Sequence, residues 1–293
     1  MLRRLLTLSS NLDMLPPFVG PYMRIDRANA HFQILKSEIL EFLGREPYRV
    51  LPETDPETDY ELFRLKVIEA IPNTWAVLIG DIFHNLRSAL DNLAIDLLRL
   101  HTQDPSKTAI DETYFPIGKT KTTFDKALQE KFKRVHPTAL KIVKRLKPYQ
   151  GGIDAFWTIH RLNILDKHVC LLPCAVTRKK TIVTFSRFVD EGDGSFAAYL
   201  NSMKEGGKVE FAGSSGLKDG DIIGSALKIE AVSPNALGGV DRARPTDQTI
   251  EFTLDIAFGK GQVIDGEPVI PAIEKIIDFT KRVIGIFERN LHC

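Results

Sequence analysis

One long predicted helix is apolar on one side and polar on the other. This combination limits the folds available to the chain. The segment "GDIFHNLRSALDNLAIDLL" covers residues 80–98 of a predicted helix that runs from about Asn73 to His101. Its apolar side consists of Ile79, Ile82, Leu86, Leu90, Leu93 and Leu97. Its polar side consists of Asp81, His84, Ser88 and Asp91, which recur every three or four residues, with Arg87 at the edge. Since the flanking residues are also apolar, the polar side is expected to be buried, and its groups must then be paired.

The segment "WTIHRLNILDKH", residues 157–168, is the natural partner for this polar side. It forms a second predicted helix in which polar and apolar residues are interleaved, with Asp154 as its candidate N-cap. Its polar residues are His160, Arg161, Asn163, Asp166, Lys167 and His168. We therefore predict that the two helices pack with their polar sides together and gather carboxylates, histidines and arginines into one cluster.

The order of predicted elements indicates an α+β protein. Helical periodicity predicts helices over residues 22–43, 73–101, 122–132, 136–146 and 154–168, with a β-hairpin near residues 47–70. Beyond Cys170 the pattern becomes β-like, and a last helix begins at Pro271. The predicted fold is an α-helical bundle with an inserted antiparallel β subdomain before the C-terminal helix. The expected boundaries are a leader over 1–21, which is open to disorder, the bundle over 22–169 plus 268–293 with the hairpin, and the β-rich insertion over 170–267.

Composition limits the class of protein. The 293 residues are 43% hydrophobic and 26% charged, which is typical of a soluble globular chain, and a net charge of +1 gives no molecule-wide field for nucleic acid or membrane. Three cysteines, Cys170, Cys174 and Cys293, lack the spacing of a zinc ribbon or a disulfide framework. No run of apolar residues is long enough to span a bilayer. These features predict a cytoplasmic protein that does not associate with membranes.

Two interpretations of the polar cluster remain open. In the structural interpretation, the buried polar residues fix the register of the helices. In the functional interpretation, titratable groups in a cleft of low dielectric have displaced pKa values and take part in proton transfer. Under the functional interpretation, His84 and His168 transfer protons while Arg87 and Arg161 stabilise an anion. The carboxylates that would orient the imidazoles are Asp81, Asp91 and Asp166.

The two helical motifs resemble those of a known group of proteins. "GDIFHNLRSALDNLA" and "IHRLNILDKH" are similar to a "GD..HNLRSALDHL" helix and an "LD..DKH" helix shared by uncharacterised bacterial proteins, over roughly residues 22–172. A more distant resemblance is to HEPN domains, helical bundles that include metal-independent ribonucleases of toxin and phage-defence systems. Their mark is an Arg, usually a polar residue next, and a His after four to six intervening residues. Arg161 and His168 have this spacing, although Leu162 stands at the polar position.

The HEPN resemblance implies a set of roles for particular residues. Arg161 and His168 would act on the ribose 2′-hydroxyl and the scissile phosphate of RNA. A homodimer is then expected, because one chain supplies a single Arg/His pair. Together with the polar helix, the candidate catalytic residues are Arg161, His168, His84, Arg87 and Asp91.

A basic segment supports an association with RNA. Residues 118–148 hold ten basic residues against Asp125 and Glu130, a net charge of +8. The basic residues are Lys119, Lys121, Lys126, Lys131, Lys133, Arg134, Lys141, Lys144, Arg145 and Lys147. Such a segment is suited to RNA phosphates, with Phe124, Phe132 or Tyr149 offering a surface on which bases stack. A solvated helix face without a nucleic-acid partner is the alternative.

Three functions follow from the sequence. The first is a HEPN-like module that associates with nucleic acid or with a protein partner, and the second is a metal-independent ribonuclease that uses Arg161 and His168. The third is a metal-dependent hydrolase, for which His84, His160, His168 and an aspartate are conceivable ligands. Because the sequence holds no HExxH motif or comparable ligand pair, we predict no bound metal and no cofactor.

Overall fold

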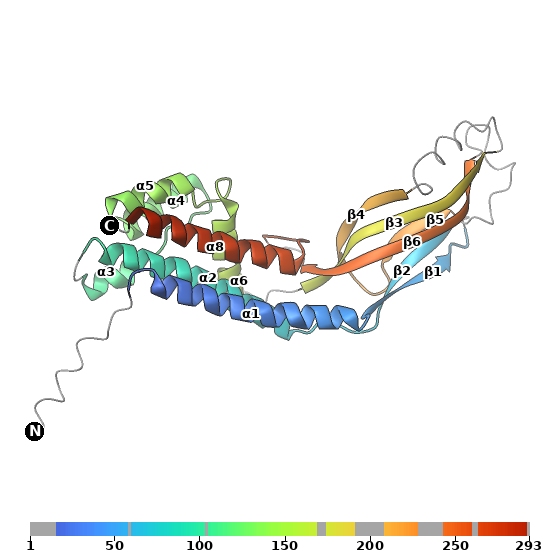
Figure 1. Cartoon of the computed structure of the whole chain (residues 1–293), viewed down its shortest axis with the longest axis horizontal. Coiled ribbons are helices and arrows are strands. Elements are labelled where there is room, and N and C mark those ends of the chain that lie inside the picture. The colour runs from blue at the N-terminus through green and yellow to red at the C-terminus, as the bar shows by residue number, and fades with distance from the viewer. Residues whose placement is uncertain are drawn as a thin grey trace, which may run out of the picture. The chain divides into compact units, whose positions relative to one another are not determined.

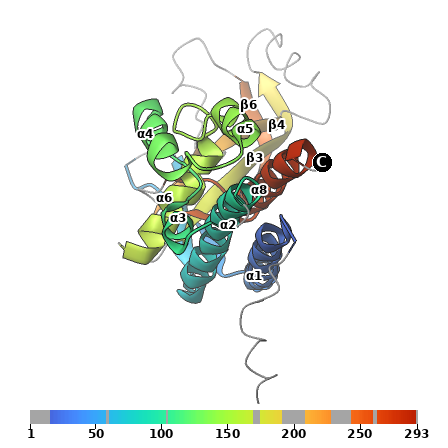
Figure 2. The same cartoon turned by 90° about the vertical axis from the view of Figure 1, so that its left-hand side faces the viewer.

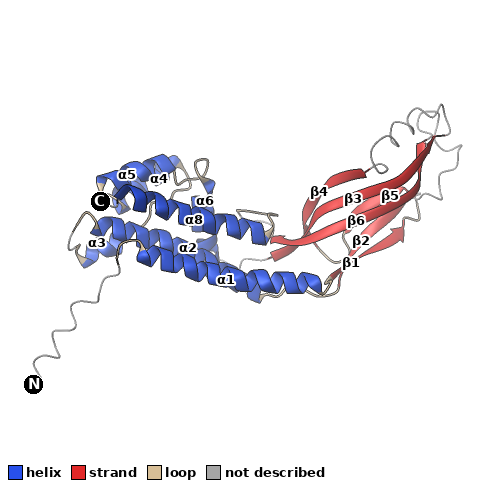
Figure 3. Cartoon of the chain, in the orientation of Figure 1, coloured by secondary structure: helices blue, strands red, loops and turns tan. Residues whose placement is uncertain are grey.

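The computed structural model describes residues 16–57, 60–102, 105–168, 174–190, 208–227, 243–259 and 263–291. It forms two compact units. The helical unit comprises Met1–Lys36, Thr74–Leu172 and Ile270–Cys293, and the β-rich unit comprises Ser37–Asn73 and Pro173–Val269. Figures 1 and 3 show the helices and strands of each unit. Of the predicted leader, residues 1–15 lie outside the described residues.

The fold class agrees with the α+β prediction, and most predicted helices are present within a few residues of their expected bounds. The helices are α1 (Val19–Gly44), α2 (Thr74–Arg99), α3 (Lys107–Glu112), α4 (Lys121–Lys131), α5 (Pro137–Leu146), α6 (Asp154–His168) and α8 (Val269–Leu291). The short α3 was not predicted, since six residues carry too little periodicity to stand out from a polar loop. Ser106 caps it, and its Oγ accepts a hydrogen bond from the amide of Ala109.

The apolar side of α2 forms the centre of the helical unit, as the sequence predicts. Its six predicted core residues are all fully buried. Around them the ring of Phe115 stacks on that of Phe156 with centroids 5.5 Å apart, and Phe287 of α8 meets Phe115 edge-on. Figure 2 shows α1, α2 and α8 side by side. Two polar contacts fix α1: the Phe18 amide donates to Asp96 of α2, and the hydroxyl of Tyr22 donates to Glu288 of α8.

Helix α6 packs against α2 through the polar sides of both helices, which confirms the predicted pairing. The contacts run in opposite directions along the two helices: Gly80 meets Asp166, and His84 Nδ1 lies 3.3 Å from the Oδ1 atom of Asn163. Gly80 faces the Asp166 carboxylate so closely that a Cβ at this position would overlap it. Gly80 therefore allows the Asp166 carboxylate to lie directly against α2.

The β-rich unit contains two antiparallel three-stranded sheets. Its strands are β1 (Tyr48–Thr54), β2 (Tyr60–Val67), β3 (Cys174–Asp190), β4 (Lys208–Leu217), β5 (Ile222–Leu227) and β6 (Ala243–Phe258). One sheet has the order β1-β2-β5 and the other the order β4-β3-β6. The sequence predicts that the hairpin near residues 47–70 belongs to the helical bundle. Instead, β2 pairs with β5, so the hairpin is part of a sheet of the β-rich unit.

The two sheets contact each other through apolar and polar groups. Phe63 of β2 and Phe252 of β6 pack with ring centroids 5.3 Å apart, and the Arg178 guanidinium of β3 donates to the Ile223 carbonyl of β5. Gly224 leaves room for the Phe252 ring, which would lie only 3.1 Å from an added Cβ. A strand pairing that the local sequence does not reveal thus joins segments about 160 residues apart.

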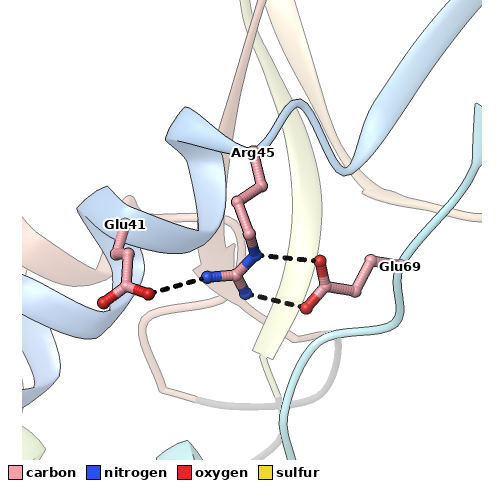
Figure 4. Close-up of polar contacts among 3 residues, drawn as sticks. All are labelled: Glu41, Arg45 and Glu69. Carbon is pink, nitrogen blue, oxygen red and sulfur yellow. Dashed lines mark hydrogen bonds and ion pairs between the residues drawn. The ribbon is translucent and has the colours of Figure 1, made fainter.

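An exposed ion-pair group links the end of α1 to the segment after β2. Arg45 donates to both carboxylate oxygens of Glu69, at 2.8 and 3.2 Å, and to Glu41 at 3.1 Å (Figure 4). The bidentate geometry with Arg45 lowers the pKa of the Glu69 carboxyl. Since all three side chains are exposed to solvent, we assign the group a modest role in orienting this connection.

The contact between α2 and α6 gives a direct prediction for Gly80→Ala. The added methyl group would overlap the Asp166 carboxylate, so this half-buried side chain must turn away from α2, and we expect a net loss of about 1 kcal/mol in the free energy of unfolding once the gain in helix propensity is included. Urea unfolding monitored by circular dichroism measures this change. Gly44→Ala is the matched control, because nothing described lies within 4 Å of a Cβ at Gly44. An equal effect of both substitutions would contradict the observed packing.

Candidate functional site

A polar cleft of about 330 Å³ opens beside the contact between α2 and α6. Its walls come from α2, from the segment between α3 and α4, from α4 and from α6. The lining residues are Arg87, Ser88, Asp91, Tyr114, Phe115, Pro116, Ile117, Ala127, Lys131, His160, Asn163 and Lys167. Its volume is within the range typical of small-molecule sites. The cleft belongs entirely to the helical unit.

Arg87 is the most deeply buried charged residue of this cleft, with 8% of its surface exposed. Its Nη2 atom donates to Oδ1 of Asp91 at 2.7 Å and to the Phe115 carbonyl at 2.9 Å. The same Asp91 oxygen accepts the Phe115 amide at 3.1 Å, so both side chains hold the segment that follows α3. The Nη1 atom of Arg87 is buried and has no hydrogen-bond partner among the described residues. The hydrogen-bonding capacity of the guanidinium is therefore not fully used by the described protein groups.

Burial disfavours the charged forms of Arg87 and Asp91, whereas the attraction between the two side chains favours these forms. Desolvation lowers the pKa of the Arg87 guanidinium and raises the pKa of the Asp91 carboxyl, while each partner counteracts the other's shift. Arginine nevertheless stays protonated, because its ordinary pKa lies far above neutrality. A buried ion pair of this kind contributes little net stability but is costly to break. It therefore holds the guanidinium in a fixed position in the wall of the cleft.

His160 lies on α6 and lines the same cleft. Its Nδ1 atom is buried and has no hydrogen-bond partner in the described part of the chain. Desolvation lowers the pKa of the imidazole to about 4, with further lowering by the positive charges of Arg87 and Arg161. His160 is thus neutral at pH 7, where one ring nitrogen donates and the other accepts. A neutral imidazole beside a guanidinium provides a hydrogen-bonding group without adding charge.

Three exposed residues complete the rim. Lys131 of α4 and Lys167 of α6 are both exposed and line the cleft. With Arg87 positive, Asp91 negative and His160 neutral, the lining carries a formal charge of +2. Tyr114 has 47% of its surface exposed and supplies an aromatic face at the rim. The arrangement is suited to an anionic ligand that also has a flat apolar part.

The predicted site residues do not lie together. Arg87 and Asp91 lie in the cleft, as described above. His84 is half-buried against Asn163, and burial, followed by the negative charge of Asp81, raises the pKa of the neighbouring Asp166. Arg161 is half-buried on α6 and is not among the described residues that line the cleft. His168 is the last residue of α6, but its side chain lies outside the described residues.

The basic side chains of residues 118–148 all lie at the surface. All ten of its Lys and Arg residues are solvent-exposed. Ion pairs join three of them to carboxylates in the described part: Lys121 to Asp125, Lys126 to Glu130 and Arg134 to Glu112. Lys131 connects this segment to the cleft. The segment therefore presents a largely uncompensated positive surface next to the cleft.

Two of the three expected stacking residues of the basic segment are not available at the surface. Phe124 and Phe132 are core residues with 3% and no exposure, so the expectation that they stack on bases is wrong. The Tyr149 ring packs on Phe124 with centroids 5.7 Å apart. Apolar periodicity explains the difference: Phe124 and Leu128 form the buried side of the amphipathic helix α4. Tyr114 is the exposed aromatic residue that the sequence analysis did not select.

Two other features are absent from the described residues. These residues contain no group of three or more His, Cys, Asp or Glu side chains placed to hold a metal ion. A helix long and apolar enough to cross a membrane is likewise not found in that part of the chain. Comparison with protein-family models gives no match, and comparisons with curated proteins and with solved structures give none either.

The burial of His160 predicts a specific dependence of stability on pH. Because the folded protein binds this proton more weakly than the unfolded chain does, stability is retained above about pH 6.5 and falls toward pH 4. The contribution is up to about 3 kcal/mol. Urea unfolding between pH 7 and pH 4 should show a shallower decline in the His160→Gln variant than in the wild-type protein. His101→Gln, at an exposed histidine, is the control and should follow the wild type; parallel curves for all three proteins would contradict the prediction.

Proposed function

We propose that the protein is a nucleic-acid-associated module whose helical unit binds single-stranded RNA. The observation that carries the proposal is the cleft, whose lining combines the guanidinium of Arg87, the exposed amines of Lys131 and Lys167, and the exposed ring of Tyr114. Cationic groups that follow a phosphate backbone and an aromatic surface for a base are the two elements of single-strand binding. Their presence in one cleft supports RNA over a purely structural role for the polar residues.

The exposed basic segment extends this surface beyond the cleft. A strand that places one nucleotide in the cleft would meet Lys131 and then further basic side chains of residues 118–148. Seven of the ten basic residues make no ion pair with the described carboxylates, so their charge is available to phosphates. A local concentration of charge on a nearly neutral chain is the pattern of a nucleic-acid surface. The clustering of basic residues is therefore the quantity relevant to RNA binding, and not the net charge of +1.

Removing part of the basic surface tests the proposal. The variant carries Lys133→Gln, Lys141→Gln and Lys144→Gln, which replace three exposed residues that lie outside the cleft lining and make no ion pair with the described carboxylates. We expect affinity for a single-stranded RNA oligonucleotide to fall at least tenfold at low salt. The slope of log affinity against log salt should shrink by about 0.7 for each phosphate that the variant no longer neutralises. Fluorescence anisotropy over a salt series measures both quantities.

A charge-matched variant separates a specific surface from general electrostatics. Lys275→Gln, Lys281→Gln and Arg282→Gln remove three exposed positive charges from α8 of the same unit. The proposal predicts a much smaller loss of affinity in this variant than in the first. Equal losses, or no RNA binding by the wild type, would refute it. RNA degradation in excess chelator that disappears in His168→Ala would instead support the ribonuclease alternative that uses Arg161 and His168.

A further inference from the structure

The charge inside the cleft is larger than a single phosphodiester requires. Arg87, Lys131 and Lys167 contribute three positive charges, and Asp91 is the one carboxylate among the described lining residues. The resulting formal charge of +2 complements a phosphate monoester, which carries about −1.5 to −2 at pH 7. A phosphodiester within a strand carries only one negative charge. The cleft is therefore better matched to the end of a nucleotide chain than to its interior.

The donors are arranged by depth. Arg87 is buried, and its Nη1 atom lacks a partner in the described part of the chain, whereas Lys131 and Lys167 are exposed at the rim. A monoester has three terminal oxygens, so it is able to accept from more than one of these cations. Half-buried His160 and buried Asn163 add neutral hydrogen-bonding groups beside these cations. An internal phosphodiester has two free oxygens and must leave the cleft at both sides.

The size of the cleft and the place of Tyr114 indicate room for more than the phosphate. A volume of about 330 Å³ lies within the range of sites that hold whole small molecules. It is larger than a phosphate group requires, which leaves space for a nucleoside. Tyr114, at 47% exposure, offers its ring to the base at the rim.

From these observations we propose that the cleft is a binding site for a phosphate monoester of a nucleotide, with the phosphate toward Arg87 and the base against Tyr114. The source of this group is either the phosphorylated end of an RNA strand or a free mononucleotide. The RNA arm of this inference rests on the proposed function. The free-nucleotide arm stands independently of it.

Binding of oligonucleotides that differ only at their ends tests the inference. One internally labelled RNA sequence is prepared with a 5′-phosphate, with a 3′-phosphate, and with hydroxyls at both ends. Fluorescence anisotropy should show one phosphorylated form binding at least tenfold more tightly than the hydroxyl form. Isothermal titration with AMP and with inorganic phosphate examines the free ligands, and AMP should bind more tightly than inorganic phosphate because it also contacts Tyr114.

Two double variants test whether the preference for a phosphorylated RNA end depends on the cleft. Lys131→Gln with Lys167→Gln removes the exposed amines of the rim and leaves the buried Arg87 in place, so the fold should be retained. In this variant the preference for the phosphorylated end, and the binding of AMP, should fall at least tenfold. Lys126→Gln with Lys275→Gln removes two exposed charges outside the cleft lining and should keep the preference.

The outcomes distinguish this inference from the proposed function. Equal binding of phosphorylated and hydroxyl RNA, with no binding of AMP, would overturn the inference and leave RNA association intact. Binding of AMP that depends on Lys131 and Lys167, without binding of any RNA, would support the monoester site and refute the proposed function. A preference that survives in the Lys131 and Lys167 variant would place the site elsewhere and overturn the inference.

Discussion

The hydrogen bonds of the buried Arg87 guanidinium are the interactions on which the cleft of the helical unit depends. Asp91, one turn along α2, and the carbonyl of Phe115 hold the guanidinium, and the Phe115 amide returns to Asp91. The arrangement attaches the segment after α3 to α2 and forms one wall of the cleft. Because removing one member of such a pair leaves a buried charge unpaired, the two residues must be kept together. Both residues also line the cleft. The Nη1 atom of Arg87 has no hydrogen-bond partner among the described protein groups.

Periodicity predicted the architecture of the helical unit. Six apolar residues of α2 at helical spacing became its core, and the polar residues beside them met the polar side of α6 as expected. Leu90 and Leu93, for example, are fully buried. Such predictions work because burial of an amphipathic side follows from the local sequence alone. The alternating, strand-like residue pattern after Cys170 likewise predicted the strands that precede α8.

Long-range pairing and the choice among similar polar residues could not be read from the sequence. Strand β2 pairs with β5 about 160 residues away, and no local pattern links those segments. Similarly, His84 and His160 both occupy polar positions on apolar helices. Only His160 lies beside Arg87 in the cleft, because α2 and α6 run past each other with Gly80 at Asp166. Tyr114 was passed over since a single aromatic residue in a loop has no periodicity to show its exposure.

A double-mutant cycle on Arg87 and Asp91 tests the central claim most directly, because it measures whether the two charges depend on each other inside the protein. Arg87→Met and Asp91→Leu would be unfolded by urea separately and in combination. The buried pair predicts a loss of about 3–5 kcal/mol for each single variant and a loss for the double variant far below the sum of the two. Small and additive losses would mean that both groups are solvated, and that the pair does not hold the guanidinium in a fixed position in the wall of the cleft.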